Sequence, residues 1–377
     1  MKIHVAGVGL TRFGELWNKS LEDLAMEAAG QAISDARIDK QKIGAIFVAN
    51  MLSSKLYGQD HLGAVVTSAL GINAAALRVE GACASGGLAV HMAVQSLLSG
   101  MYEHVLVVGV EKMTDVLPSL ITTALSGAGS EDERRAGLTF PGLYALMARM
   151  HMQTYGTTRE QMAAVAVKNH FHASLNDRAH FQFEISIEKV LTSPTISNPF
   201  TLFDASPISD GAAAVVLSSK PIKKGVVITG SAVATDTIGL DKRKNLTELT
   251  ATTIAAKKAW KQSGVGVKNI DVMEVHDCFT IAEIMAMEDL GFCAKGEGGR
   301  FIESGQTRLG KKLPVNPSGG LKACGHPVGA TGIKQIVEIV QQLRGVSGKR
   351  QVSGAKVGLT HNVGGTGATV VVHILQK

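Results

Sequence analysis

The sequence is poor in cysteine and in aromatic residues, and it has no long unbroken apolar run. Only 4 of its 377 residues are cysteine; these lie far apart, and no two form a C-x-x-C pair. This argues against a disulfide framework and a structural zinc site, and it is typical of a reducing, cytoplasmic compartment. No apolar run approaches the roughly 18 residues that a membrane-spanning helix needs, so we expect no membrane partner. Strand-like sequence begins at Ile3, which leaves no room for a signal peptide.

Strong charge is missing as well. The 38 basic and 32 acidic residues leave a net charge of +6, and no basic block is longer than Lys242-Arg243-Lys244. Aromatic residues make up 5% of the chain and are not interleaved with basic ones, as they would be on a nucleic-acid platform. The composition argues against nucleic-acid binding and favours an enzyme with a small polyanionic substrate.

Small and apolar residues are abundant: the chain has 42 glycines and a hydrophobic fraction of 45%. Its length suits two core-forming units of roughly 150 residues each. Strand and helix patterns alternate in the first part of the chain, which predicts an α/β fold with a buried sheet. The expected elements are a strand at 3–9, a helix after Ser20, a strand at 43–48, a helix at 62–70 and a strand at 105–110.

The second half of the chain repeats the first. Residues 38–50 align with 265–277, and the helix that begins near Gly87 aligns with one that begins near Gly332. Several units that match in the same order favour an internal duplication over chance similarity of short apolar segments.

The duplication predicts two units, at residues 1–225 and 226–377, with the boundary at Lys223-Lys224-Gly225. From about 115 to 198 the strand pattern disappears and a helical stretch at 158–172 follows. We expect this region to be an inserted lid within the first unit.

Cys83 is the first candidate for chemistry. It lies among small residues, just before an apolar helical pattern that ends at Gly100 and predicts a buried helix. Free N–H groups and the dipole at a helix start favour a thiolate, and small neighbours let a carbonyl approach the sulfur. The alternative is an inert buried cysteine, since free cysteine is often buried.

Three second-half stretches interrupt the regular scaffold where strands end or a helix begins. They are His276-Asp277-Cys278, the turn around His326, and His361-Asn362-Val363-Gly364. Sites in α/β sheets gather beyond the carboxyl ends of strands, and the duplication would bring His326 face to face with Cys83. For acyl transfer, His326 could act as the base that a cysteine nucleophile needs, and His276 and glycine-rich backbone amides could donate hydrogen bonds to the oxyanion. The second thiol, Cys278, could carry a proton. Each stretch also has a purely structural interpretation: His326 as a histidine in a turn, Cys278 as a buried apolar side chain, and Gly364-Gly365 as a tight turn.

These stretches resemble the signature blocks of the thiolase superfamily. The blocks are Ala82-Cys83-Ala84-Ser85-Gly86, Ser209-Asp210-Gly211-Ala212-Ala213-Ala214, His276-Asp277-Cys278-Phe279, Gly325-His326-Pro327-Val328-Gly329-Ala330-Thr331-Gly332 and His361-Asn362-Val363-Gly364-Gly365. The His-Asp-Cys-Phe block is similar to the sterol-carrier-protein type and to archaeal acetoacetyl-CoA thiolases. The resemblance covers nearly the whole chain. It implies a five-layered αβαβα sandwich of two duplicated βαβαβ halves with an inserted loop domain.

The resemblance also implies roles in a ping-pong Claisen condensation of two acetyl-CoA and its reversal. Cys83 would be the nucleophile, His326 its base, and His276 a donor to the thioester oxygen. Cys278 would exchange the α-proton. The last block has His361 where ordinary thiolases have their acid/base cysteine, so His361 is the alternative proton shuttle or a helper.

A second oxyanion hole would use the Cys83 amide and an amide near Val363-Gly364. Ser206 matches a position that touches the pantetheine arm of coenzyme A. The phosphates could meet Arg149, Lys168 and Arg178.

The resemblance implies no permanent cofactor and no metal; coenzyme A and acetyl-CoA are substrates. It implies a homodimer or tetramer, and a complex with hydroxymethylglutaryl-CoA synthase through a small zinc-containing OB-fold protein. Alternatives are a thiolase for longer 3-ketoacyl-CoA chains, a thiolase-like retro-aldolase and a non-catalytic scaffold. A decarboxylating ketoacyl synthase or a hydroxymethylglutaryl-CoA synthase is disfavoured by the pairing of His276 with Cys278.

Overall fold

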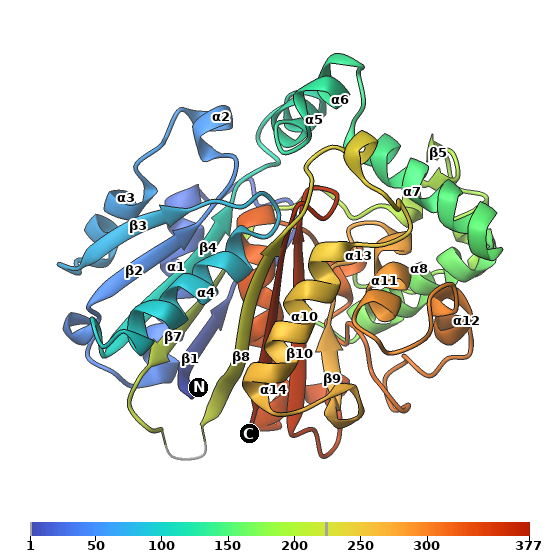
Figure 1. Ribbon diagram of the computed structural model, residues 1–377. Coiled ribbons are helices and arrows are strands. Elements are labelled where there is room, and N and C mark those ends of the chain that lie inside the picture. Colours follow the sequence, from blue (N-terminus) through green and yellow to red (C-terminus); the bar gives the residue numbers. More distant parts are fainter. Residues whose placement is uncertain (1, 223–224) are drawn as a thin grey trace.

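The computed structural model describes residues 2–222 and 225–377 (Figure 1). The boundary predicted at Lys223-Lys224 lies outside these residues, so the division into 1–225 and 226–377 stays a prediction. Among the described residues, no helix is both long and apolar enough to cross a membrane.

The first half alternates strands with helices, as its patterns predict. Ser20 caps the first long helix, where its side chain accepts a hydrogen bond from the backbone N–H of Asp23. The elements are β1 (Ile3–Leu10), α1 (Leu21–Ala36), β2 (Ala45–Ala49), α2 (Ser53–Tyr57), α3 (Leu62–Leu70), β3 (Ala75–Val79), α4 (Ser85–Leu98), β4 (His104–Glu111) and, after the inserted region, β7 (Gly211–Ser218).

The region between β4 and β7 is mostly helical, and its longer helices pack on elements of the second half. It contains α5 (Pro118–Ser126), α6 (Glu131–Arg135), α7 (Phe140–Tyr155), α8 (Arg159–Ser174), α9 (Ile187–Leu191) and a short hairpin of β5 (Thr195–Ser197) and β6 (Phe200–Thr201). A buried ion pair between Lys168 of α8 and Glu283 of α11 (Thr280–Asp289) links the two.

The second half repeats the same order. Its elements are β8 (Val226–Thr235), α10 (Thr250–Ser263), β9 (Val272–Glu274), α11, α12 (Gly298–Glu303), α13 (Gly320–Cys324), α14 (Val328–Arg344), β10 (Val357–Gly364) and β11 (Thr369–Gln376). The alignment of 38–50 with 265–277 is confirmed, because it superposes β2 on β9. Strand β3 has only a partial counterpart, a single bridge between Met273 and Val315.

Apart from the separate β5-β6 hairpin, the strands of the described residues form one continuous sheet in the order β3-β2-β4-β7-β1-β8-β11-β10-β9. Its two halves are joined along three residue pairs of β1 and β8. Helices α4 and α14 pack between the halves, while α1 covers one outer face and α10 the other (Figure 1). The five-layered αβαβα arrangement of the thiolase fold is thus confirmed.

Glycines let the two central helices meet at their starts. A Cβ on Gly332 of α14 would lie 2.2 Å from the backbone nitrogen of Gly87 in α4, and a Cβ on Gly86 would lie 2.8 Å from the nitrogen of Gly332. Only glycine permits so close an approach. Because Cys83 and His326 precede these two helices, the contact brings both residues to one place.

Candidate active site

Cys83 lies in a tight turn that leads into α4. The preceding residue, Ala82, has a left-handed φ of +53°, which is unusual for a residue other than glycine. The hydroxyl of Ser85 braces the turn, since it accepts from the N–H of Gly81 at 2.9 Å and donates to the carbonyl of Ala82 at 2.6 Å. The prediction that Cys83 immediately precedes the helix is confirmed.

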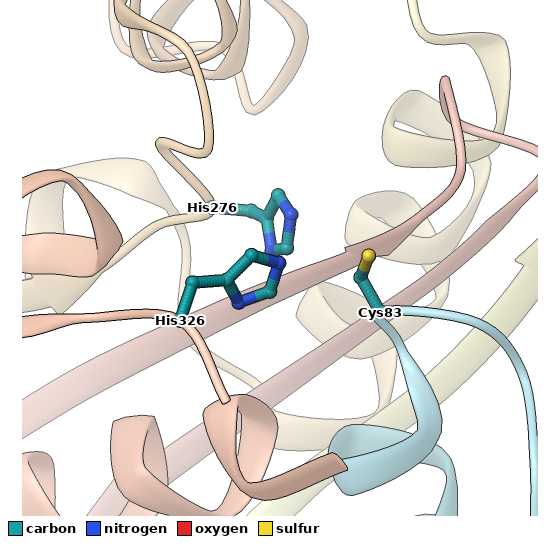
Figure 2. Close-up of side chains that lie close together, drawn as sticks. All are labelled: Cys83, His276 and His326. Atoms are coloured by element: carbon teal, nitrogen blue, oxygen red, sulfur yellow. The ribbon is translucent and has the colours of Figure 1, made fainter. Parts of the chain in front are cut away.

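The structure brings three of the predicted residues together. The Sγ of Cys83 and one ring nitrogen each of His276 and His326 all lie within 4.8 Å of one another. Figure 2 shows both imidazoles facing the sulfur. Their ring centroids are 5.2 Å apart and the rings are nearly perpendicular, at 85°. One histidine comes from the end of β9 and the other from the start of α14, so both belong to the second half.

Hydrogen bonding determines which nitrogen of His326 carries the proton. The hydroxyl of Thr331 donates to the carbonyl of Pro327 at 2.9 Å and lies 2.7 Å from Nδ1 of His326. A hydroxyl has one proton to donate, so Nδ1 must donate to Thr331. The Nε2 of His326 therefore holds a free lone pair, and it has no hydrogen-bond partner among the described residues. This nitrogen can accept the Cys83 proton.

His276 has the opposite tautomer because of Asn362. The side-chain oxygen of Asn362 accepts from the N–H of Gly87 at 3.0 Å, and its nitrogen donates to the Cys83 carbonyl at 2.9 Å. These backbone partners fix the orientation of the amide. Its nitrogen lies 3.3 Å from Nδ1 of His276 and carries only donors, so that Nδ1 accepts. The Nε2 of His276, which no described residue hydrogen-bonds, then carries a proton and can donate to an oxyanion.

Burial keeps the cluster uncharged in the free enzyme. Burial lowers the pKa of His326 to about 3 and the pKa of His276 well below its usual value, the latter helped by the two neighbouring imidazoles of His326 and His361. Both rings are neutral near pH 7.

The expected thiolate at Cys83 is wrong for this state. Part of the residue is exposed toward a cavity, yet protein atoms surround the sulfur, and burial raises the pKa of Cys83 to about 12. The backbone N–H groups of Gly365 and of Cys83 itself lower the pKa of Cys83, but each by less than burial raises it. The site thus holds a thiol beside a neutral base, and proton transfer must accompany attack.

Cys83 and His326 open into a largely apolar cavity of about 180 Å³, which Cys278 also lines. Ser206 is in the wall, and its N–H donates to the Cys278 carbonyl at 2.9 Å, whereas its contact with the pantetheine arm stays a prediction. The other lining residues are Met113, Thr122, Leu125, Phe140, Pro141, Tyr144, Ala205, Pro207, Ile208, Phe279, Val328 and Gly365. Burial raises the pKa of Cys278 more than any other influence, and the nearby Cys83 raises it further.

The predicted oxyanion hole at the Cys83 amide and an amide near Val363-Gly364 stays a prediction. The amide that hydrogen-bonds the Cys83 sulfur belongs to Gly365, whereas Val363 and Gly364 lie within strand β10, paired with β11. Gly365 follows the strand with a left-handed φ of +62°, so the chain turns there and its amide can face the sulfur.

His361 does not line the cavity. Its Nε2 lies 3.0 Å from the hydroxyl of Thr252 in α10, on the face of β10 opposite to Asn362. Its role as the alternative shuttle of the α-proton, or as a helper, stays a prediction.

The suggested phosphate contacts are scattered. Lys168 is wrong as a coenzyme A ligand, because it is 1% exposed and its ammonium is held by Glu283 and the carbonyl of Val315. Arg178 lines a separate polar pocket and donates to the Leu10 carbonyl at 2.9 Å. Arg149 is exposed on α7 and stays a prediction.

The Cys83–His276–His326 cluster is close enough to share a metal ion, but its protonation argues against one. A metal would need lone pairs on the facing nitrogens, and Asn362 keeps a proton on that of His276. The donor set fits acyl transfer better than metal binding.

Four functional neighbours were absent from the sequence prediction. Asn362 and Thr331 stand inside the recognised blocks, so their position in those blocks was the available signal. Gly365 ends the last block. Tyr144 comes from the inserted region, where no pattern marks it.

Comparison with known proteins identifies the family. The family model "Thiolase, N-terminal domain" matches residues 3–221, and "Thiolase C-terminal domain-like" matches residues 232–377. Acetyl-CoA acetyltransferase of Methanothermobacter thermautotrophicus is 48% identical, over 100% of this chain and 99% of that protein. Sterol carrier protein 2 of Bos taurus is 35% identical, over 98% of this chain and 71% of that protein.

A solved structure named "Ltp2-ChsH2(DUF35) aldolase" superposes with a TM-score of 0.85 at 25% identity, over 99% of this chain and 97% of that chain. The two family models together span nearly the whole chain, and the archaeal relative is 48% identical over 99% of its length. These matches assign the chain to a family. The chain belongs to the thiolase family and is an acyltransferase.

Proposed function

We propose that this chain condenses two acetyl-CoA to acetoacetyl-CoA and catalyses the reverse thiolysis, by ping-pong acyl transfer through Cys83. One observation carries the proposal: the Cys83 sulfur and one ring nitrogen each of His276 and His326 lie within 4.8 Å of one another, and the Nε2 atoms of both rings have no hydrogen-bond partner among the described residues. A nucleophile, a base and an oxyanion donor are what acyl transfer requires. The name of the archaeal relative supports acetyl-CoA as substrate.

In the first half-reaction, Nε2 of His326 takes the Cys83 proton and the sulfur attacks the thioester carbon of acetyl-CoA. The amides of Cys83 and Gly365 hold the oxygen of the tetrahedral intermediate. The C–S bond to coenzyme A then breaks, and the leaving thiolate takes the proton of Cys278. The enzyme is left with an acetylated Cys83, a Cys278 thiolate and a protonated His326.

In the second half-reaction, the Cys278 thiolate removes an α-proton from the second acetyl-CoA. His276 and the protonated His326 hold the enolate oxygen. The enolate carbon attacks the acetyl carbon on Cys83, and the departing sulfur regains its proton from His326. Protons and charges then return to their starting places, and no cofactor is consumed.

The size of the cavity supports a short acyl group. A volume of about 180 Å³ must hold both the acyl chain and the end of the pantetheine arm, and the ring side chains of Phe140, Tyr144 and Phe279 line it. The alternative, thiolysis of longer 3-ketoacyl-CoA, draws on the similarity to sterol carrier protein 2. Relative rates of thiolysis of acetoacetyl-CoA and of 3-ketoacyl-CoA of six to sixteen carbons would distinguish the two.

The central test is the acyl-enzyme itself. Intact mass after incubation with acetyl-CoA should show one added acetyl group on the wild type, mapped to Cys83, and none on Cys83→Ala. Cys278→Ala should still be acetylated but should form no acetoacetyl-CoA. A Cys83→Ala enzyme that condenses acetyl-CoA at the wild-type rate would refute the proposal. Equal loss of acetylation in Cys278→Ala would refute the division of roles.

A thiolase-like retro-aldolase is the second candidate, supported by the superposition on a structure named as an aldolase. Such an enzyme has no need of a thiol nucleophile. The placement of Cys83 against a lone pair on His326 therefore favours acyl transfer.

We propose that the chain forms a homodimer through the exposed edge of its sheet. Strand β3 ends the sheet, and Leu77 on it is 52% exposed. The pattern of the neighbouring helix α4 predicts burial on all sides, and this is wrong on one side. Met92 and Leu98 of this helix are 45% and 47% exposed. Pairing of two β3 edges in a homodimer would cover these side chains. The mass in solution, and its change in a Leu77→Lys variant, tests this.

A complex with hydroxymethylglutaryl-CoA synthase through a zinc-containing OB-fold protein stays a proposal. The aldolase structure carries in its name a DUF35 protein alongside a chain of this fold, which supports the search for a comparable partner. Copurification of the untagged chain from its host would test it.

A further inference from the structure

Tyr144 shares the wall of the cavity with the two thiols, Cys83 and Cys278. It comes from α7 in the inserted region, is 1% exposed and lines the same cavity as Cys83 and Cys278. Its hydroxyl donates to the carbonyl of Gly365 at 2.9 Å. That residue's amide hydrogen-bonds the Cys83 sulfur, so a single residue separates Tyr144 from the nucleophile.

The ring of Tyr144 also holds its hydroxyl near Cys278. The ring stacks on Phe279, the residue after Cys278, with centroids 4.8 Å apart and planes inclined by 27°. Phe279 in turn stacks on Phe200 at 5.4 Å. Three aromatic rings thus fix the position of the hydroxyl, and they leave its O–H bond free to rotate.

The proposed reaction requires Cys278 as a thiolate, in a place that disfavours one. Burial and the neighbouring Cys83 both raise its pKa, whereas the nearby Tyr144 side chain lowers it. The other polar side chains that line the cavity are Thr122, Ser206, Cys83 and His326. Among these side chains, Tyr144 also stacks its ring on Phe279, the residue next to Cys278.

We infer that Tyr144 is a positioning residue for the α-proton transfer: its hydroxyl turns from the Gly365 carbonyl to the Cys278 sulfur once the Cys278 thiolate has formed. The inference rests on the proposed function. No bond to Tyr144 forms or breaks. The α-proton passes from the acetyl carbon to the Cys278 sulfur, the electron pair stays on the enolate, and Tyr144 keeps its own proton, since burial raises its pKa well above the usual value.

The rotation has a second consequence. When the hydroxyl leaves the Gly365 carbonyl, the loop that presents the Gly365 amide to Cys83 loses one of its anchors. Proton transfer at Cys278 is thereby coupled to the oxyanion hole over the acetylated Cys83. Attack of Cys83 on acetyl-CoA, which precedes formation of the Cys278 thiolate, does not use the rotated hydroxyl.

Tyr144→Phe tests the inference, because it keeps the aromatic stack and removes only the hydroxyl. Two rates are measured from pH 6 to 10: acetylation of Cys83 by acetyl-CoA, followed by mass, and exchange of the acetyl α-protons in D₂O, followed by NMR. We expect acetylation to stay within about threefold, while exchange and condensation fall about 10- to 100-fold, as for loss of a hydrogen bond to a charged group. The pH midpoint of exchange should move upward.

Tyr155→Phe is the matched control. Tyr155 lies on the same helix, but its hydroxyl lies 3.4 Å from that of Thr247 and it does not line the cavity. It should leave both rates and the pH midpoint unchanged.

Equal slowing of acetylation and exchange in Tyr144→Phe, with an unmoved pH midpoint, would overturn the inference and leave Tyr144 a packing residue. Unchanged exchange would overturn it too. Failure of the proposed function looks different, because the wild type itself would then form no acetyl-Cys83.

Discussion

Replacing Asn362 by aspartate should reverse the tautomer of His276. The carboxylate of Asp has oxygen where the amide has its N–H₂ group, so it would accept from Nδ1 of His276 instead of donating to it. The proton would leave the Nε2 that faces Cys83. The side chain keeps its size, and the N–H of Gly87 keeps an acceptor.

The magnitude follows from the two bonds that change. Loss of one oxyanion donor costs about 10²–10³ in turnover. The Cys83 carbonyl also loses its 2.9 Å partner, and an unsatisfied buried carbonyl costs about 1–3 kcal/mol of folding stability. We therefore expect Asn362→Asp to fold with a lower Tm and to cleave acetoacetyl-CoA at least about 100-fold more slowly.

Nitrogen-15 NMR of labelled histidine provides the assay, because it distinguishes a protonated from an unprotonated ring nitrogen. Wild type should show protonated Nε2 at His276 and protonated Nδ1 at His326, and Asn362→Asp should change only the first. The variant should also become sensitive to Zn²⁺, since three lone pairs would then face one point. A variant that keeps the His276 Nε2 proton, or turnover within threefold of wild type, would refute the tautomer reasoning.

Three further predictions concern other contacts. Thr331→Val removes the acceptor that orients His326 and should slow Cys83 acetylation about tenfold, with the His276 signal unmoved; normal acetylation would contradict the base assignment. Gly332→Ala places a Cβ 2.2 Å from the Gly87 nitrogen and should cost more than about 2 kcal/mol in urea unfolding; Gly345→Ala, at an open helix end, would strain only its own left-handed φ of +80° and should cost less. Burial lowers the pKa of His373 from 6.5 to about 3. The unfolded chain therefore binds more protons below pH 6.5, and as the pH falls wild type should lose up to about 1.4 kcal/mol per pH unit relative to His373→Gln; parallel stability curves would contradict this.

Periodicity and capping were sufficient for most regular elements of the first half and for the α/β class, whereas the five-layered arrangement followed from the resemblance to the thiolase superfamily. The strand and helix patterns of the first half, the Ser20 cap and the internal repeat all correspond to elements of the structure. Such features depend on neighbours in the chain, so a sequence displays them directly. The β3 counterpart was the exception, because a single bridge at Val315 leaves no pattern.

Local rules failed where distant groups meet. The helix start at Cys83 predicts a thiolate, but density of packing around the sulfur decides its pKa. Lys168 has the charge for a phosphate, yet Glu283 from another element holds it. In both cases the deciding atoms come from parts of the chain far away in sequence.

What the sequence determined by itself was the set of chemical groups and the two-fold repeat that carries them: a cysteine before one helix, a histidine before its counterpart, and a histidine and cysteine after a strand. Tertiary structure alone decided their protonation. Which nitrogen of each imidazole bears hydrogen depends on Thr331 and Asn362, and those two partners act through the direction of single hydrogen bonds. Such directions exist only once the halves have packed together.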